Sequence, residues 1–516
     1  MSVAEEIKAI AAVEQTFDVN SVVYRGVKVW PLIRIHIDYF FYQLANNANI
    51  DLSSPRPVSK LNSVDLKFSQ IQEEYLKQSQ TWREILTPFS FLDRTDILFF
   101  SRYENHSEKI GGKFVDRFLD PIQELCQAKY NTLKLELDFP QGREKQPRRD
   151  PSIFVNPYSC LVKENLIQKC LESSLNSKFS KINNFLELQT TVKKYTELHI
   201  DETQVISQIH LLNSYYILFK DLLSVIRPRV VFLVCYYYIA AMALIRACRE
   251  LGVKTIEVQH GIQGRYHKQY ASWTRIPQSG YELLPDFFWV WSEQCQQDIM
   301  ETRPSLLANQ ECHLPIVGGN PWLGKWLEED LGLNERERQF LDGLKQYRKV
   351  VLVSLQNFDT LSEFIEFLIP AMSHKPDEWF WLLRFHPLHQ SDREVNTVLD
   401  VLKTANLQNF DIQFSTEISL YALLKRCDYH LTLNSTVCHE AYAFGVRSGI
   451  IDPKYGYIYY QKQIQQGSFD FVTGAEELIV NIEANTRKYS DRNDSTRYID
   501  PRSELSEGAL NRLLDP

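Results

Sequence analysis

The chain of 516 residues contains nine cysteines, but no two of them form a Cys-x-x-Cys pair. Their odd number and irregular spacing are typical of reduced thiols in a cytosolic protein, and they argue against a disulfide framework or a zinc site. No Asp-x-Asp run occurs in a suitable strand context. We therefore expect a cytoplasmic protein that holds no metal and no cofactor.

A signal peptide and a transmembrane helix are not expected either. The stretch MSVAEEIKAIAAVEQ starts acidic and lacks the apolar core of a signal peptide. The strongest apolar run, VVFLVCYYYIAAMALI at 230–245, is too short to span a bilayer comfortably and carries three tyrosines. It predicts a buried strand that continues into a buried helix.

Two large classes of ligand site are missing from the sequence. The formal net charge of −8 argues against a general nucleic-acid binder, because such proteins neutralise phosphates. No Gly-x-Gly-x-x-Gly follows the first strand of either half, and no Gly-x-x-x-x-Gly-Lys-Ser/Thr occurs. The usual dinucleotide and nucleoside-triphosphate loops are therefore absent.

Two series of alternating strands and helices occupy most of the chain. RPRVVFLVCYYY, AAMALIRACRELG and KTIEVQHG form a strand, a helix closed by glycine and a second strand, and a similar series begins at KVVLVSLQN. This alternation predicts an α/β fold with doubly wound parallel sheets. The expected domains are a helical N-terminal extension (1–94), two Rossmann-like domains facing a cleft (95–312 and 313–475) and a helical tail (476–516).

Polar side chains follow several of the predicted strands, and ligands of open parallel sheets bind outside the carboxyl ends of strands. In the first half, His260 follows the strand TIEV, and Glu104 and His106 follow an earlier strand. The candidates of the second half are Ser354, Gln356, Asn357, Arg384, His386, Pro387, Asn434, Ser435, Thr436 and Glu440. A lone histidine after a strand is more often structural, but His260 and His386 in different halves favour a function in the cleft.

The run Asn434–Thr436 precedes a helix, where its hydroxyl groups suit a cap. The same position suits a phosphate, because backbone N–H groups and the helix dipole both favour an anion. Glu440, one turn into that helix, suits the hydroxyl groups of a ribose; the alternative is a solvated or capping carboxylate. Gly261 is expected to let the backbone turn without a Cβ clash, so that the imidazole of His260 faces the cleft.

Short motifs at these positions resemble those of GT-B glycosyltransferases, specifically bacterial surface-polysaccharide enzymes. RFHP (384–387) and NST (434–436) are similar to the His-Pro and Ser/Thr motifs of bacterial sialyltransferases, Kdo transferases and teichoic-acid glycerophosphotransferases. EAYAFG (440–445) resembles a helix common at GT-B nucleotide sites, and VGGNPW (317–322) resembles a segment that often opens the C-terminal half. QHG (259–261) resembles the His-Gly of teichoic-acid and capsule polymerases, whose histidine is held to act as a base.

The resemblance implies transfer from a nucleotide-sugar donor, with a CMP-sugar such as Kdo or sialic acid favoured, to a bacterial surface glycan or lipid-linked acceptor. His386 and the hydroxyl groups of NST would stabilise the leaving phosphate, with Arg384 either beside them or pointing into the sheet. The other candidates of the second half complete the implied nucleotide site. His260 would be the base, with Glu104 or His106 as alternatives. Thr432 stands where retaining enzymes carry an acid, so the stereochemical outcome stays open.

Three other functions remain open. A CDP-glycerol glycerophosphotransferase would share the His-Gly and His-Pro placements, and a nucleotide-sugar epimerase can use the same fold. A non-catalytic two-domain binding protein would show no turnover and would need no histidine in both halves. The segment RYHKQYASWTR (265–275) mixes cations with aromatic rings, so we expect it to touch an anionic lipid-linked glycan or the inner membrane, or to be a solvated loop.

Overall fold

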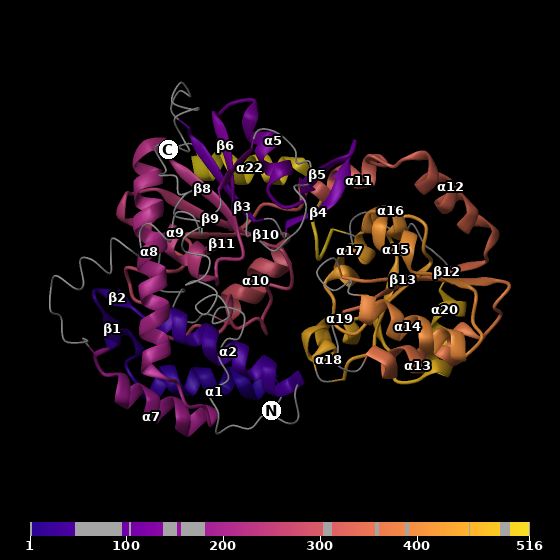
Figure 1. Ribbon diagram of the computed structural model, residues 1–516, viewed down its shortest axis with the longest axis horizontal. Helices are drawn as coiled ribbons and strands as arrows, with labels where there is room; N and C mark the ends of the chain where they lie inside the picture. The colour runs from indigo at the N-terminus through magenta and orange to yellow at the C-terminus, as the bar shows by residue number, and fades with distance from the viewer. Residues whose placement is uncertain are drawn as a thin grey trace, which may run out of the picture.

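The structure, a computed structural model, describes residues 3–46, 95–102, 105–137, 152–155, 181–302, 312–356, 361–386, 392–453, 455–485 and 496–514. Two parallel β-sheets, each covered by helices, form two Rossmann-like domains preceded by N-terminal helices (Figure 1). The predicted α/β architecture of two doubly wound domains is therefore confirmed.

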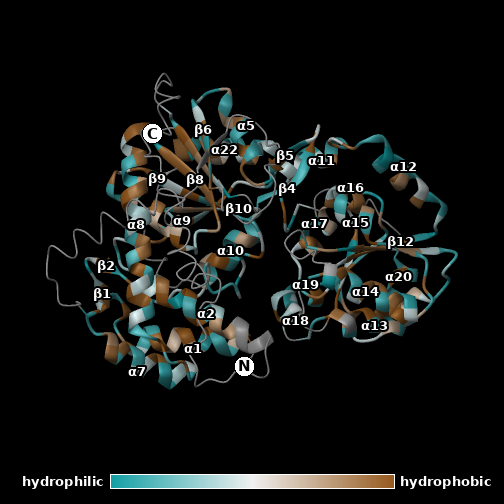
Figure 2. Ribbon diagram, in the orientation of Figure 1, coloured by the Kyte–Doolittle hydropathy of each residue, from teal (hydrophilic) through white to brown (hydrophobic). Residues whose placement is uncertain are grey.

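The first domain is built on a seven-stranded sheet in which all neighbouring strands are parallel, in the order β11-β10-β9-β8-β3-β6-β7. The run VVFLV of β8 is buried along its whole length, as expected for a strand with helices over both faces of its sheet (Figure 2). The strands are β3 (Ile97–Arg102), β6 (Thr132–Leu137), β7 (Ser152–Val155), β8 (Val230–Val234), β9 (Lys254–Val258), β10 (Phe287–Val290) and β11 (Leu314–Val317). The helices are α5 (Asp120–Gln127), α7 (Phe185–Thr196), α8 (Glu202–Ile226), α9 (Ile239–Glu250) and α10 (Glu293–Glu301).

The apolar run at 230–245 forms strand β8 and the first part of helix α9, as the sequence predicts. Helix α9 ends just before Gly252, whose φ of +70° is the left-handed conformation that closes many helices. Within the described ranges, no helix is long and apolar enough to cross a membrane.

The N-terminal elements pack against the first domain and share its core. Val13 and Ile33 belong to the same buried cluster as Leu188, Leu212 and Trp273 of the domain itself. These elements are α1 (Val3–Thr16), η1 (Val19–Ser21), β1 (Val23–Tyr24), β2 (Val27–Lys28) and α2 (Trp30–Asn46). The described part of the extension is therefore an integral layer of the first domain.

The second domain has a six-stranded parallel sheet in the order β14-β13-β12-β15-β16-β17. In this sheet the strand order runs outwards in one direction from β12 and in the other direction from β15. In the first sheet it does the same from β3 and β8. Ligand sites of doubly wound sheets form at such switch points. The strands are β12 (Lys349–Ser354), β13 (Trp379–Arg384), β14 (Phe410–Asp411), β15 (Tyr429–Thr432), β16 (Arg447–Ile450) and β17 (Phe469–Phe471). The helices are α11 (Pro321–Glu328), α12 (Glu335–Gly343), η5 (Leu344–Gln346), α13 (Leu361–Met372), α14 (Asp392–Thr404), α15 (Gln413–Glu417), α16 (Leu420–Leu424), α17 (Val437–Ala443), α18 (Gly456–Tyr459), α19 (Gln461–Gln465) and α20 (Ala475–Ala484).

Two features connect the domains. The antiparallel hairpin of β4 (His106–Ile110) and β5 (Lys113–Asp116) leaves the first domain beside α11 (Figure 1). Val115 of this hairpin lies in one buried cluster with Trp322, Trp326 and Tyr421 of the second domain. Strand β11 pairs with β10, so the first sheet continues past the boundary expected at residue 313.

The C-terminal helix α22 (Ser503–Leu514) returns to the first domain and lies beside α5 (Figure 1). Leu510 and Leu513 are buried in the cluster that includes Trp289, and the Ser506 hydroxyl donates to the Gly318 carbonyl at 2.6 Å. Arg229 donates to the carbonyl of Leu514 at 2.6 Å, which satisfies an end of the helix. The last helix therefore covers part of a sheet whose strands come much earlier in the chain.

We expect Leu510→Ala to lower the free energy of unfolding by about 2–5 kcal/mol, because it leaves a cavity under α22. Val480→Ala is the matched control, since Val480 lies on α20 with 63% of its surface exposed. Urea unfolding followed by circular dichroism measures both variants. An unchanged midpoint for Leu510→Ala would show that α22 does not support the first domain.

Candidate active site

A cleft of about 550 Å³ lies between the carboxyl ends of the two sheets. Of the predicted site residues, it is lined by His260, Ser354, Gln356, Arg384, His386, Asn434, Ser435, Thr436 and Glu440. Glu104, Asn357 and Pro387 lie outside the described residues. The cleft is also lined by residues that the sequence analysis missed, among them Arg102, Glu108, Arg117, Tyr237, Gln263 and His267.

The wall of the second domain is held by a reciprocal amide pair. Gln356 donates from Nε2 to Oδ1 of Asn434 at 2.8 Å and accepts the Asn434 backbone N–H at 3.0 Å. Asn434 in turn donates to Asp452 at 2.9 Å. These contacts fix the ends of β12 and β15 against each other at the switch point of the sheet.

The Ser/Thr loop contributes a cap to the short helix α17. The hydroxyl of Ser435 accepts the backbone N–H of Val437 at 3.3 Å, whereas Thr436 makes no capping bond through its side chain. The capping interpretation therefore holds for Ser435. Ser354 is also engaged, because its hydroxyl lies 2.8 Å from Nε2 of the buried His430.

Arg384 uses its guanidinium to hold the turn that follows α15. It donates to the carbonyl oxygens of Ser415 at 2.7 Å and Ile418 at 2.5 Å, both at the end of that helix. Burial lowers its pKa to about 10, so it remains charged near neutral pH. The adjacent His386 is exposed on the cleft surface. Arg384 thus ties the end of β13 to the turn after α15.

Glu440 is buried, with 3% of its surface exposed, and is neither solvated nor a helix cap. Its Oε1 accepts the hydroxyl of Tyr421 at 2.6 Å and lies 3.8 Å from Nη1 of Arg117. Arg117 comes from the first domain, so this ion pair crosses between the domains. Burial of Arg117 opposes the charged form of its guanidinium. Glu440 and other nearby acids nevertheless raise the pKa of Arg117.

Glu108 is the second buried carboxyl group on the cleft. It belongs to the hairpin β4–β5 and accepts the hydroxyl of Ser419 at 3.1 Å from the second domain. Burial raises the pKa of Glu108, against the opposing effect of the nearby Arg117 and Arg384. Sequence reasoning missed it because its hairpin carries no strand-end signal.

His260 follows β9 and faces the cleft. Its Nδ1 lies 3.7 Å from the buried carboxylate of Glu257, which favours a proton on Nδ1, and its Nε2 lies 3.3 Å from the hydroxyl of Tyr237. Burial lowers the pKa of His260 to about 3, and the nearby His267 and Arg102 act in the same direction. The imidazole is therefore neutral near pH 7.

Gly261 does not have the role expected from the sequence. A Cβ at this position would meet no atom within 4 Å, and its φ lies outside the left-handed range. The turn after β9 is fixed instead by Gln259, whose side chain donates to the carbonyl of Gly261 at 2.9 Å and accepts from the Trp291 backbone at 2.7 Å.

His106 lies behind the cleft and does not line it. Its Nδ1 is 3.2 Å from the carbonyl of Arg102, and its Nε2 is 3.2 Å from the carboxylate of Glu136. Glu136 also lies 3.1 Å from Lys134, inside the sheet layer. Of the three predicted bases, only His260 faces the cleft within the described part of the chain.

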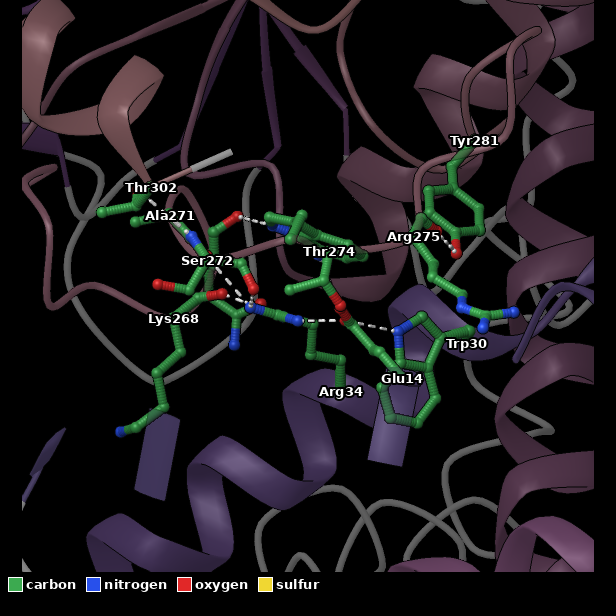
Figure 3. A network of polar contacts seen from close by, with 12 residues as sticks. Glu14, Trp30, Arg34, Lys268, Ala271, Ser272, Thr274, Arg275, Tyr281 and Thr302 are labelled. Atoms are coloured by element: carbon green, nitrogen blue, oxygen red, sulfur yellow. Dashed lines mark hydrogen bonds and ion pairs between the residues drawn. The ribbon is translucent and has the colours of Figure 1, made fainter. Parts of the chain in front are cut away.

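The middle of the segment 265–275 is buried and its backbone contacts Arg34 and Glu14 of the N-terminal helices (Figure 3), whereas Arg265 and Arg275 at its ends are exposed. The interpretation as a solvated or membrane-facing loop is therefore wrong for the middle of the segment. Lys268 forms ion pairs with Asp38 at 2.6 Å and Glu6 at 2.9 Å, and Trp273 is fully buried. The partners of Lys268 lie more than 200 positions earlier in the chain, and the sequence pattern did not reveal them.

Comparisons with known proteins give only distant structural likenesses. No protein-family model matches the sequence, and no curated protein matches it significantly. UDP-GlcNAc 2-epimerase from Neisseria meningitidis, bound to UDP-GlcNAc, shares 12% identity over 82% of this chain and 100% of its own, with a TM-score of 0.47. The Methanocaldococcus jannaschii UDP-GlcNAc 2-epimerase shares 13% (81% and 99% covered, TM-score 0.44), and trehalose-6-phosphate synthase OtsA shares 11% (82% and 97%, TM-score 0.45). These are GT-B enzymes, but likenesses of this size carry no argument about activity.

We expect the His260 ring to stay neutral down to about pH 4, because its pKa of about 3 lies far below the ordinary value of about 6.5. Between pH 3 and pH 6.5 the unfolded chain protonates His260 and the folded chain does not. The free energy of unfolding therefore decreases as the pH falls from 6.5 toward 3. An NMR titration of the histidine rings measures the pKa, with His260→Gln assigning the signal. A midpoint above pH 6 would contradict the lowered pKa of this half-buried ring.

Proposed function

We propose that this chain is a glycosyltransferase that takes its sugar from a nucleotide-activated donor bound in the cleft. The observation that carries the proposal is that the switch points of both sheets open onto one shared cleft. The wall of the second domain presents the His-Pro and Ser/Thr positions, and that of the first presents His260 and two arginines. The wall of the second domain suits a nucleotide, and the wall of the first domain suits an acceptor.

The donor is assigned to the second domain. His386 follows β13, is exposed, and lines the same cleft as the amide pair of Gln356 and Asn434. Arg117 reaches this wall from the first domain and supplies a positive charge opposite the departing phosphate. Glu440 beside it accepts hydrogen bonds and suits the ribose. The resemblance of RFHP and NST to sialyltransferase and Kdo-transferase motifs favours a CMP-sugar.

The acceptor is assigned to the first domain, with His260 as the base. Nε2 of a ring protonated on Nδ1 is an acceptor, and it takes the proton of the attacking hydroxyl as the bond to the sugar forms. Its basicity is low because burial, the nearby His267 and the two arginines Arg102 and Arg117 disfavour the charged ring. The negative phosphates of a bound donor offset these arginines and raise the basicity of His260.

We expect His386→Ala to weaken donor binding at least tenfold and to leave the fold intact, because the side chain is exposed on the cleft. CMP, CDP, UDP and GDP are titrated by calorimetry, and hydrolysis of the corresponding activated donors identifies the nucleotide. His199→Ala is the control, since His199 is exposed on the first domain away from the cleft lining. Wild-type donor affinity in His386→Ala would remove the residue from the site.

We expect His260→Asn to reduce the catalysed transfer rate roughly a hundredfold to ten-thousandfold, which is typical for loss of a general base. Donor affinity should stay within about threefold of the wild type, because the donor is held mainly by the other domain. Initial rates and nucleotide titrations of the same preparation separate the two effects. Unchanged transfer would make His260 structural, and a wild-type protein without any turnover would favour the non-catalytic binding protein.

A further inference from the structure

A second cavity, of about 240 Å³, lies on the other side of the loop that follows His260. It is bordered by that loop, by α10, α17, α18 and α19, and by the segment that precedes α22. Ile262, Gln263 and Tyr459 line both this cavity and the cleft. The two spaces are therefore neighbours separated by three side chains.

Three buried side chains present polar atoms without a hydrogen-bond partner among the described residues. Both amide atoms of Gln263, with 1% of its surface exposed, lack a partner. The same holds for Oε1 of Gln463 and Nε2 of His439, each on a residue that is 7% exposed. All three residues line the second cavity. Buried polar atoms of this kind cost free energy unless a ligand or water pairs with them.

The lining of the cavity suits a neutral, hydroxyl-rich ring. The amides of Gln263 and Gln463 can each donate and accept, as vicinal hydroxyl groups require. Tyr266 and Tyr459 add aromatic surface, with ring centroids 6.5 Å apart. The cavity is smaller than the roughly 300–1,000 Å³ of sites for drug-sized ligands, which fits a small ring.

The charges at the cavity argue against an anionic ligand. Lys462 lies 3.9 Å from Asp298, which also accepts the side chain of Gln294 at 2.9 Å. Arg265 is paired with Glu301 at 2.5 Å. Each cation at the rim thus has a carboxylate beside it, so no excess positive charge is left for a phosphate.

We propose that this cavity binds one neutral sugar ring of the acceptor, while the reacting end of the same acceptor lies in the cleft at His260. The assignment of an acceptor rests on the proposed function, whereas the sugar site itself does not. Gln263 lies between the two spaces and contacts the glycan at the point where it passes from one to the other. The acceptor is therefore a glycan of more than one residue.

The test uses the methyl β-glycosides of glucose, galactose and N-acetylglucosamine as probes, with binding measured by saturation-transfer NMR. We expect at least one glycoside to bind the wild type. Gln463→Leu should raise the dissociation constant of that glycoside about tenfold, because it removes one or two hydrogen bonds to the sugar. Gln463 lines only the second cavity, so nucleotide affinity should not change. Gln339→Leu is the matched control, since its side chain bonds Glu335 on the exposed surface of α12.

Stability gives a second measurement that needs no ligand. Gln263→Leu and Gln463→Leu replace buried amides that carry at least one unpaired polar atom with apolar groups of similar size, so the melting temperature should stay the same or rise. A marked fall would show that the amides are bound within the protein and would overturn the proposal. Failure of all three glycosides to bind the wild type, or equal binding by wild type and Gln463→Leu, would also overturn it.

The two proposals can fail separately. If the glycosides bind but no activated donor is bound or turned over, the sugar site stands and the transferase does not. If donors are turned over but the glycosides do not bind, the transferase stands and this cavity is not its acceptor site. With both present, Gln463→Leu should raise the KM for a glycan acceptor and leave the kcat within about twofold.

Discussion

The buried ion pair of Arg34 and Glu14 holds the loop that brings His267 and Tyr270 to the cleft (Figure 3). Arg34 donates to the carbonyl oxygens of Lys268 at 3.0 Å and Ala271 at 3.0 Å, and Glu14 accepts the backbone N–H of Thr274 at 2.7 Å. Both charges are fully hydrogen-bonded, which is the condition under which burial of an ion pair is tolerated; losing one partner typically costs about 3–5 kcal/mol. The N-terminal helices thereby fix a segment that starts five residues after His260.

Charges of different domains meet at the cleft and couple its geometry to its contents. Arg117 of the first domain pairs with Glu440 of the second, while Glu108 of the first accepts from Ser419 of the second. A phosphate that enters the cleft competes with Glu440 for the same guanidinium. If the proposed donor binds here, it would act directly on a contact between the domains, and its affinity would depend on how the two domains are arranged.

The sequence predicted the elements whose patterns are local and missed those that depend on distant partners. Buried runs such as VVFLV predicted the parallel sheets, and the strand ends predicted the cleft positions of His260 and His386. Strands β14 and β17 have only two and three residues, too few for a recognisable period. Arg117 lies just after the hairpin strand β5, whose direction no local pattern reveals, and Lys268 looked solvated because its carboxylate partners belong to the N-terminal helices.

The loop after β9 concentrates the groups that are least favourable for stability. His260 and His267 are half-buried and neutral, with pKa values lowered by desolvation to about 3 and about 4, and the amide of Gln263 lacks a partner among the described residues. Such groups persist only where the surrounding structure holds them firmly, and they gather at sites that bind or transform a ligand. In this protein the Arg34–Glu14 network fixes the backbone of the loop. The N-terminal helices, whose described residues line neither cavity, stabilise a loop that offers polar groups to two adjoining spaces.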